Sequence, residues 1–203
     1  MRLIETIEAY QRNDPAARSK FEIFLLYNGL HAQIYYRIAH WLYVHELKFL
    51  ARWVSQIARH RTGVEIHPAA KIGRRLVIDH GTGIVIGATA EIGDDCLIYQ
   101  GVTLGGTGAQ KGKRHPTLGN NVMVGCGAKI LGPFKVGDNA RIAANSVVLK
   151  EVPPNSTVVG VPGRVVKIDG EKLDHIHTPD PIRAELDYLT ERIKKLEEQL
   201  ENK

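Results

Sequence analysis

The sequence predicts a mainly β protein: a left-handed parallel β-helix of hexapeptide repeats, preceded by an α-helical region and followed by a coiled-coil-like helix. The first observation is a period of six among the aliphatic residues in the middle of the chain. All 14 positions of the period are Ile, Leu or Val: Ile66, Ile72, Ile78, Ile84, Ile86, Ile92, Ile98, Leu104, Leu118, Val124, Ile130, Val136, Ile142 and Val148. Helices repeat every 3.6 residues and amphipathic strands every two, so neither explains this period. Short strands joined by corners, with three strands closing a triangular coil of about 18 residues, do explain it.

Two interruptions of the period are the expected places for function, because solenoids carry insertions on their surface, where binding loops are found. The first is a two-residue shift at Ile84 and Val85. The second is the insertion 106–117, GTGAQKGKRHPT, which is polar, basic and rich in glycine.

The second observation is a helical pattern in residues 1–62. The stretch 27–60 has apolar residues three and four apart and no Gly or Pro after Gly29. Asp14 before Pro15 predicts the start of a helix. Glycine becomes frequent from Val64 onward, which predicts a β-helix domain over 63–168 that includes the insertion.

The third observation is a heptad stripe in the last segment, 169–203, which we interpret as a linker and a helix. Aliphatic residues alternate spacings of four and three at Ile182, Leu186, Leu189, Ile193, Leu196 and Leu200. This pattern favours self-association over a packed surface helix. A coiled coil this short is marginal alone, so we expect it to add to an oligomer formed elsewhere.

Composition sets broad limits on location and partners. No apolar run approaches the 18 or so residues of a membrane-spanning helix, and the opening MRLIETIEAY lacks the pattern of a signal peptide, so we expect a cytoplasmic protein. The net charge of +5 suits either nucleic acid or an acidic nucleotide such as CoA. The two cysteines, Cys96 and Cys126, are predicted to be buried free thiols.

Reactive side chains gather in three segments: 65–68, 79–83 and 114–116. Glu65 and His80 are 15 residues apart in a coil of about 18, so we expect them to be vertical neighbours on one face. A carboxylate beside an imidazole fixes its tautomer and stabilises its charged form, which makes a general base able to activate an alcohol for attack on a thioester. The alternative is a structural histidine, and the acidic neighbours Glu65 and Asp79 favour the catalytic interpretation.

The motifs around these segments resemble those of the serine O-acetyltransferases of bacteria and plants. The resemblance covers about residues 10–168 and is carried by HPAAKIG, IDHGTGIVIG, YQGVTLGGTG, KRHP, GAKILG and GVPGRVV. It implies transfer of an acetyl group from acetyl-CoA, as co-substrate, to the hydroxyl of L-serine in cysteine biosynthesis. It also implies that His80 is the general base and Glu65 its carboxylate partner, where many members have Asp.

The resemblance further implies the residues that bind the two substrates. Asp79, Arg114 and His115 match residues that hold the ammonium and carboxylate of serine, and Asp14 matches another ammonium contact. An arginine fork suits a carboxylate, and Asp supplies charge to an ammonium.

For acetyl-CoA, the resemblance places Gly106 and Thr107 beside the thioester, where backbone N–H groups can stabilise an oxyanion. Cys126 and Ala144 match residues lining the pantetheine groove. Arg164 and Lys167 are candidate phosphate contacts, with a solvated charge as the alternative. No metal is expected, because His175 and His177 alone make a poor site.

Two departures from the family concern partners. The helical region is shorter than in long members, whose extra helices join two trimers, so a homotrimer is expected. The chain ends Glu201-Asn202-Lys203 and lacks the C-terminal Ile with which many members enter the next enzyme of cysteine synthesis, so that complex is not expected. Neither nucleic acid nor a membrane is an expected partner.

Three other functions were weighed. A hexapeptide acetyltransferase acting on a sugar hydroxyl or amine needs one catalytic His but not the Asp14, Asp79 and Arg114 set. A non-catalytic β-helix binding protein gives no reason for the His and acidic residues beside a glycine-rich insertion. A nucleoside triphosphate site is disfavoured, because Thr107 stands where a P-loop needs its first Gly and Arg114 where it needs Ser or Thr.

Overall fold

The computed structural model describes residues 2–108, 111–172 and 189–194. The chain divides into two compact units, Met1–Glu171 and Lys172–Lys203. In the second unit residues 189–194 are helical, with Leu189 and Ile193 exposed. The other four heptad positions lie outside the described residues, so the predicted coiled coil stays a prediction.

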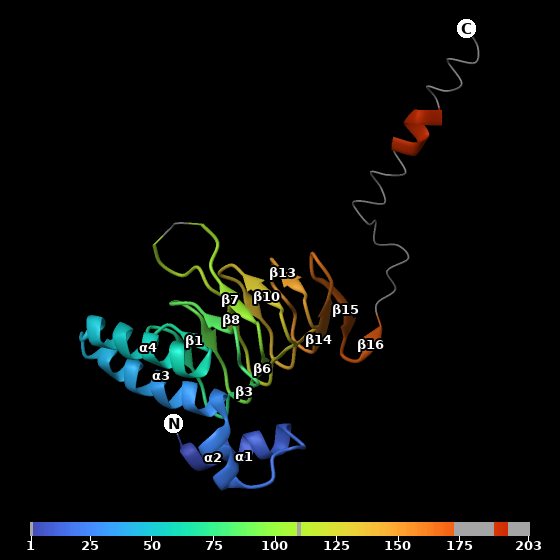
Figure 1. Cartoon of the computed structure of the whole chain (residues 1–203). Coiled ribbons are helices and arrows are strands. Elements are labelled where there is room, and N and C mark those ends of the chain that lie inside the picture. Colours follow the sequence, from blue (N-terminus) through green and yellow to red (C-terminus); the bar gives the residue numbers. More distant parts are fainter. Residues whose placement is uncertain (1, 109–110, 173–188, 195–203) are drawn as a thin grey trace. The chain divides into compact units, whose positions relative to one another are not determined.

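Four helices open the first unit and lie at one end of the β-helix (Figure 1). They are α1 (Leu3–Asn13), α2 (Lys20–Leu26), α3 (Asn28–Val44) and α4 (Lys48–Thr62). The helix α4 ends on Gly63, whose φ of 72° is the left-handed conformation that glycine adopts easily at such a position. Among the described helices, none is both long and apolar enough to cross a membrane.

The prediction that Asp14 starts a helix is wrong. Asp14 follows the last residue of α1, and its backbone N–H bonds to Tyr10 O. The residue before a proline disfavours the helical conformation, so Asp14 ends one helix instead of beginning another. Its Oδ1 then accepts from the N–H of Ala16 at 2.8 Å, which closes the turn after the helix.

The β-helix consists of three sheets, which form the three faces of a prism. The first face contains β1 (Glu65–Ile66), β4 (Val85–Ile86), β7 (Thr103–Gly105), β10 (Lys129–Leu131) and β13 (Val147–Val148). The second contains β2 (Lys71–Ile72), β5 (Glu91–Ile92), β8 (Thr117–Leu118) and β11 (Lys135–Val136). The third contains β3 (Val77–Asp79), β6 (Leu97–Tyr99), β9 (Met123–Val124), β12 (Arg141–Ile142), β14 (Ser156–Val159), β15 (Arg164–Ile168) and β16 (Glu171–Lys172).

The predicted parallel β-helix and its core are confirmed. All 14 aliphatic positions of the period are buried, and all except Ile84 lie in strands. Strands of successive coils pair in parallel, and the exception is β15, which runs antiparallel to β14. Identical inward positions therefore stack from coil to coil into aliphatic ladders.

The strand register shows where the insertions lie. Glu65 pairs with Val85, 20 residues later, whereas Val85 pairs with Thr103 after 18. The predicted site of the shift at Ile84 and Val85 is wrong, since Asp79 still pairs with Tyr99 and Gly83 N bonds to Gly63 O. The two extra residues thus belong to the corner between Asp79 and Gly83, which contains His80. Corners make few ladder hydrogen bonds, so a bulge is tolerated there.

The second insertion leaves the coil after β7 and returns at β8. Thr117 is already part of β8, so the loop comprises 106–116 and is one residue shorter than predicted. It raises the coil from 18 residues to 26, the separation of Thr103 and its partner Lys129.

The helices supply hydrogen bonds to the open edge of the first coil, which has no coil beneath it. Five side chains bond to its backbone: Tyr10 Oη accepts from Ile78 N, while Gln33, Tyr36, Arg37 and His40 contact the carbonyls of Leu76, Ala70, Gly73 and Pro68. Four of the five come from α3. The close approach of α3 requires Gly29, because a Cβ there would lie 2.1 Å from Ile78 O.

Candidate active site

The predicted site residues fall on two edges of the prism. We call the corners that join the third face to the first the His80 edge, and those that join the first face to the second the loop edge. The His80 edge carries Asp79, His80, Cys126 and Ala144, and the loop edge carries Gly106, Thr107, Arg114 and His115.

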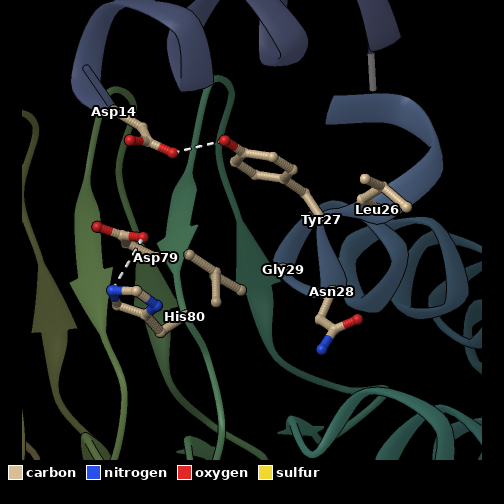
Figure 2. Close-up of a pocket in the computed structure, with 8 residues that line it drawn as sticks. Asp14, Leu26, Tyr27, Asn28, Gly29, Asp79 and His80 are labelled. Atoms are coloured by element: carbon tan, nitrogen blue, oxygen red, sulfur yellow. Dashed lines mark hydrogen bonds and ion pairs between the residues drawn. The ribbon is translucent and has the colours of Figure 1, made fainter. Parts of the chain in front are cut away.

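A hollow of about 280 Å³ lies at the first corner of the His80 edge, against the helical region. Figure 2 shows the side chains of Asp14, Asp79 and His80 gathered along it. The other residues that line it are Leu26, Tyr27, Asn28, Gly29 and Ile78. Segments that are far apart in sequence therefore bring two carboxylates and one imidazole together.

His80 presents its imidazole to solvent. The side chain is 74% exposed, and its Nε2 lies 3.9 Å from Oδ1 of Asp79. The backbone adopts a φ of 58°, which histidine tolerates better than most residues. An accessible imidazole next to a carboxylate can accept a proton from a bound hydroxyl group.

Asp14 is held by Tyr27, which the sequence did not single out. The Tyr27 hydroxyl donates to Asp14 Oδ2 at 2.6 Å (Figure 2). Burial, followed by the hydrogen bond to Asp14, raises the pKa of Tyr27 to about 12, so the phenol keeps its proton. No sequence signal marked Tyr27, because the turn between α1 and α2 brings it to a partner 13 residues away.

Glu65 lies on the first face, below the end of the His80 corner. Its backbone N–H bonds to Ile84 O, and its carboxylate lies 3.4 Å from Nε of Arg59. Within the described residues, its ion pair is with Arg59 and not with His80. The expected offset of one coil is wrong because both residues belong to the first coil, and the Glu65–His80 dyad itself stays a prediction.

On the loop edge, His115 is buried and packs over Gly87, where a Cβ would lie 2.0 Å from the ring. Its Nδ1 accepts from the backbone N–H of Thr89 at 3.2 Å. A neutral ring that accepts at Nδ1 carries its proton at Nε2. Thr89, unmarked in the sequence, also fixes the end of the loop, because its Oγ1 accepts from the N–H groups of Arg114 and His115.

Positive charge gathers around two uncharged imidazoles on this edge. Burial, followed by Arg52, His115 and Arg114, lowers the pKa of His67 to about 4. Burial and then Arg114 also lower the pKa of His115. The Arg114 side chain is exposed and passes beside Gly106, where a Cβ would lie 3.0 Å from its Cγ. Such an environment suits an anionic ligand.

The candidate CoA residues follow the His80 edge from coil to coil. Gly127 N bonds to Gln100 O, and Asn145 N bonds to Cys126 O, so the corners stack directly. Ala144 is exposed, and Arg164 and Lys167 lie on β15, which pairs with the last parallel strand. The prediction of a buried thiol holds for Cys96 but is wrong for Cys126, which is partly exposed because corner residues point away from the core.

A parallel β-helix of six-residue repeats with reactive side chains at its corners is the architecture of the hexapeptide-repeat transferases. The family model described as bacterial transferase hexapeptide (six repeats) matches residues 115–150.

Comparison with individual proteins narrows this class. The serine acetyltransferase of Synechococcus elongatus is 55% identical over 191 residues, covering 93% of this chain and 78% of that protein. The serine acetyltransferase of Bacillus pumilus is 55% identical over 203 residues, covering 98% and 90%. The crystal structure of Neisseria gonorrhoeae serine acetyltransferase in complex with serine superposes with a TM-score of 0.79 at 43% identity, covering 81% of this chain and 67% of that one. The chain belongs to the serine acetyltransferase family.

The lowered pKa of His67 predicts a specific loss of stability in acid. The unfolded chain takes up a proton at this imidazole as the pH falls below the ordinary value of 6.5, whereas the folded chain does so only near 4. The free energy of unfolding should therefore fall between pH 6.5 and 4, by about 1 to 2 kcal/mol after allowance for solvent screening.

Urea unfolding at pH 7 and pH 4.5 measures this loss. His67→Asn, which keeps an acceptor for the N–H of Ala69, should reduce it. His60→Asn, at an exposed position near the end of α4, should behave like the wild type. An NMR titration of His67 with a midpoint near 6.5 would contradict the prediction.

Proposed function

We propose that the protein transfers the acetyl group of acetyl-CoA to the hydroxyl of L-serine, forming O-acetyl-L-serine for cysteine biosynthesis. The observation that carries the proposal is the hollow in which His80 lies beside the carboxylates of Asp14 and Asp79. A proton acceptor flanked by two anions suits a substrate with both a hydroxyl and an ammonium group. The complex of the Neisseria gonorrhoeae relative with serine supports this choice.

In the proposed mechanism, His80 accepts the proton of the serine hydroxyl as its oxygen attacks the thioester carbonyl. The C–S bond then breaks, and the leaving thiolate of CoA takes the proton back from the imidazolium. Glu65 is the proposed carboxylate partner of the ring, which requires its side chain to turn from Arg59 toward His80. Backbone N–H groups at Gly106 and Thr107 are the proposed donors to the oxyanion.

Serine binding is proposed to use both edges of the prism. Asp14 and Asp79 would hold the ammonium group, while Arg114 and His115 would hold the carboxylate. The first pair borders the His80 edge and the second lies on the loop edge of the same chain. In a homotrimer, the His80 edge of one copy would face the loop edge of the next, which would complete each site between two copies.

Acetyl-CoA is proposed to extend along the His80 edge. Cys126 and Ala144 would line the pantetheine, since they follow His80 on stacked corners. Arg164 and Lys167 would meet the phosphates at the far end. The thioester would thereby lie next to the hollow.

Acceptor choice and the role of His80 are tested together. CoA release from acetyl-CoA should be fastest with L-serine among serine, homoserine, threonine and an amino sugar. In the same assay, His80→Ala should lower turnover with serine by about two to four orders of magnitude, because a general base is lost. A preference for the sugar would favour the rival acetyltransferase, and near-normal turnover by folded His80→Ala would contradict the assignment of the base.

Arg114→Lys tests the carboxylate contact. Lysine keeps the charge but not the bidentate fork, so KM for serine should rise about tenfold or more, which corresponds to about 1.4 kcal/mol. KM for acetyl-CoA should change little. Steady-state kinetics with each substrate varied in turn separates the cases: no change means a solvated charge, and a rise confined to acetyl-CoA means a phosphate contact.

Sharing of the site between copies is tested by mixing two inactive variants. Co-expressed His80→Ala and Arg114→Ala chains should form mixed trimers in which about a quarter of the sites combine an intact His80 edge with an intact loop edge. Activity should therefore reappear well above that of either variant alone. No recovery in isolated mixed oligomers would show that each copy supplies its whole site.

A further inference from the structure

We propose that Tyr27 is a positioning residue for serine binding, which aims the carboxylate of Asp14 at the substrate ammonium. The inference rests on the proposed function, in which Asp14 is an ammonium contact. Its basis is the arrangement of contacts around Asp14 in the hollow, none of which the sequence motifs indicated.

The Asp14 carboxylate is held at both of its oxygens. Oδ2 accepts from the Tyr27 hydroxyl at 2.6 Å, and Oδ1 accepts from the N–H of Ala16 at 2.8 Å. Two donors on different segments fix the rotation of the carboxylate, and each oxygen retains a lone pair for a cation. Since Asp14 stands where α1 has already ended, its backbone alone does not fix the side chain.

Tyr27 is itself anchored to the strand that carries the other carboxylate. Its ring meets that of Tyr10 edge to face, with centroids 5.6 Å apart and planes at 86°. The Tyr10 hydroxyl accepts from the N–H of Ile78, the residue before Asp79, and from Gln33. Tyr27 therefore relates Asp14 to Asp79 through one continuous set of contacts.

The Tyr27 hydroxyl acts through Asp14 and not on the reacting atoms. It is already used as the donor in a short, charge-assisted hydrogen bond. Proton transfer stays with His80, whose ion-pair partner is Asp79. Removing the hydroxyl should therefore weaken serine binding and leave the chemical step and acetyl-CoA binding nearly unchanged.

Tyr27→Phe removes only this hydroxyl. KM for serine should rise about three- to tenfold, as expected for a lost charge-assisted hydrogen bond, while kcat and KM for acetyl-CoA change less than about twofold. Tyr36→Phe is the matched control, because its hydroxyl bonds to Ala70 O in the first coil and does not line the hollow. That variant should lose thermal stability and keep the KM for serine.

A double-mutant cycle with Asp14→Asn decides whether Tyr27 acts through Asp14. The inference holds if Tyr27→Phe adds no further rise in KM once Asp14 is changed. It is overturned if the two effects multiply independently, or if Tyr27→Phe alone leaves KM for serine unchanged while Asp14→Asn raises it. If Asp14→Asn leaves KM for serine unchanged, the ammonium contact in the proposed function is itself wrong.

Discussion

The structure depends on the stacking of each coil on the one before it. Strands of only two to five residues contribute few hydrogen bonds each, so their partners must come from neighbouring coils. Stacking fixes which residue lies above which, and it directs one side chain in two toward the aliphatic ladders. The corners make fewer of these bonds, which explains why both insertions and nearly all candidate site residues of the β-helix occur there.

The sequence predicted the β-helix well because its signal is repeated. An error at one position of a period such as Ile66, Ile72 and Ile78 changes little when many others agree. The motif resemblance also placed Asp79, His80 and Arg114 at corners. The register failed locally, because a periodic pattern shows that two residues were gained but not whether they lie at Ile84 or at His80.

The contacts that the sequence did not predict involve single side chains from distant segments. Tyr27 meets Asp14 only because α1 and α2 fold back on each other, and Thr89 meets His115 only because the loop returns to the second coil. Neither residue belongs to a periodic pattern or to a spacing rule. The helix start expected at Asp14 failed for a related reason, since the same local residues suit either end of a helix.

The two edges of the prism differ in charge in a way that matches the two ends of an amino acid. Carboxylates gather at the His80 edge, whereas the loop edge combines Arg114 with imidazoles whose lowered pKa values keep them neutral. Neutral imidazoles can donate hydrogen bonds to an anion without adding a charge that varies near pH 7. The difference in potential would orient a zwitterion before any specific contact forms.

The hydrogen bonds from α1 and α3 to the first coil have a consequence for solubility. A stack of parallel coils has no intrinsic end, because its last exposed strands can accept another coil from any copy of the same chain. Tyr10, Gln33 and Tyr36 occupy backbone groups that such a copy would use. At the opposite end, the antiparallel turn of the chain into β15 presents a strand of the wrong direction for continued parallel growth. Both ends of the β-helix are thus protected against the head-to-tail fibres that its repeating core would otherwise favour.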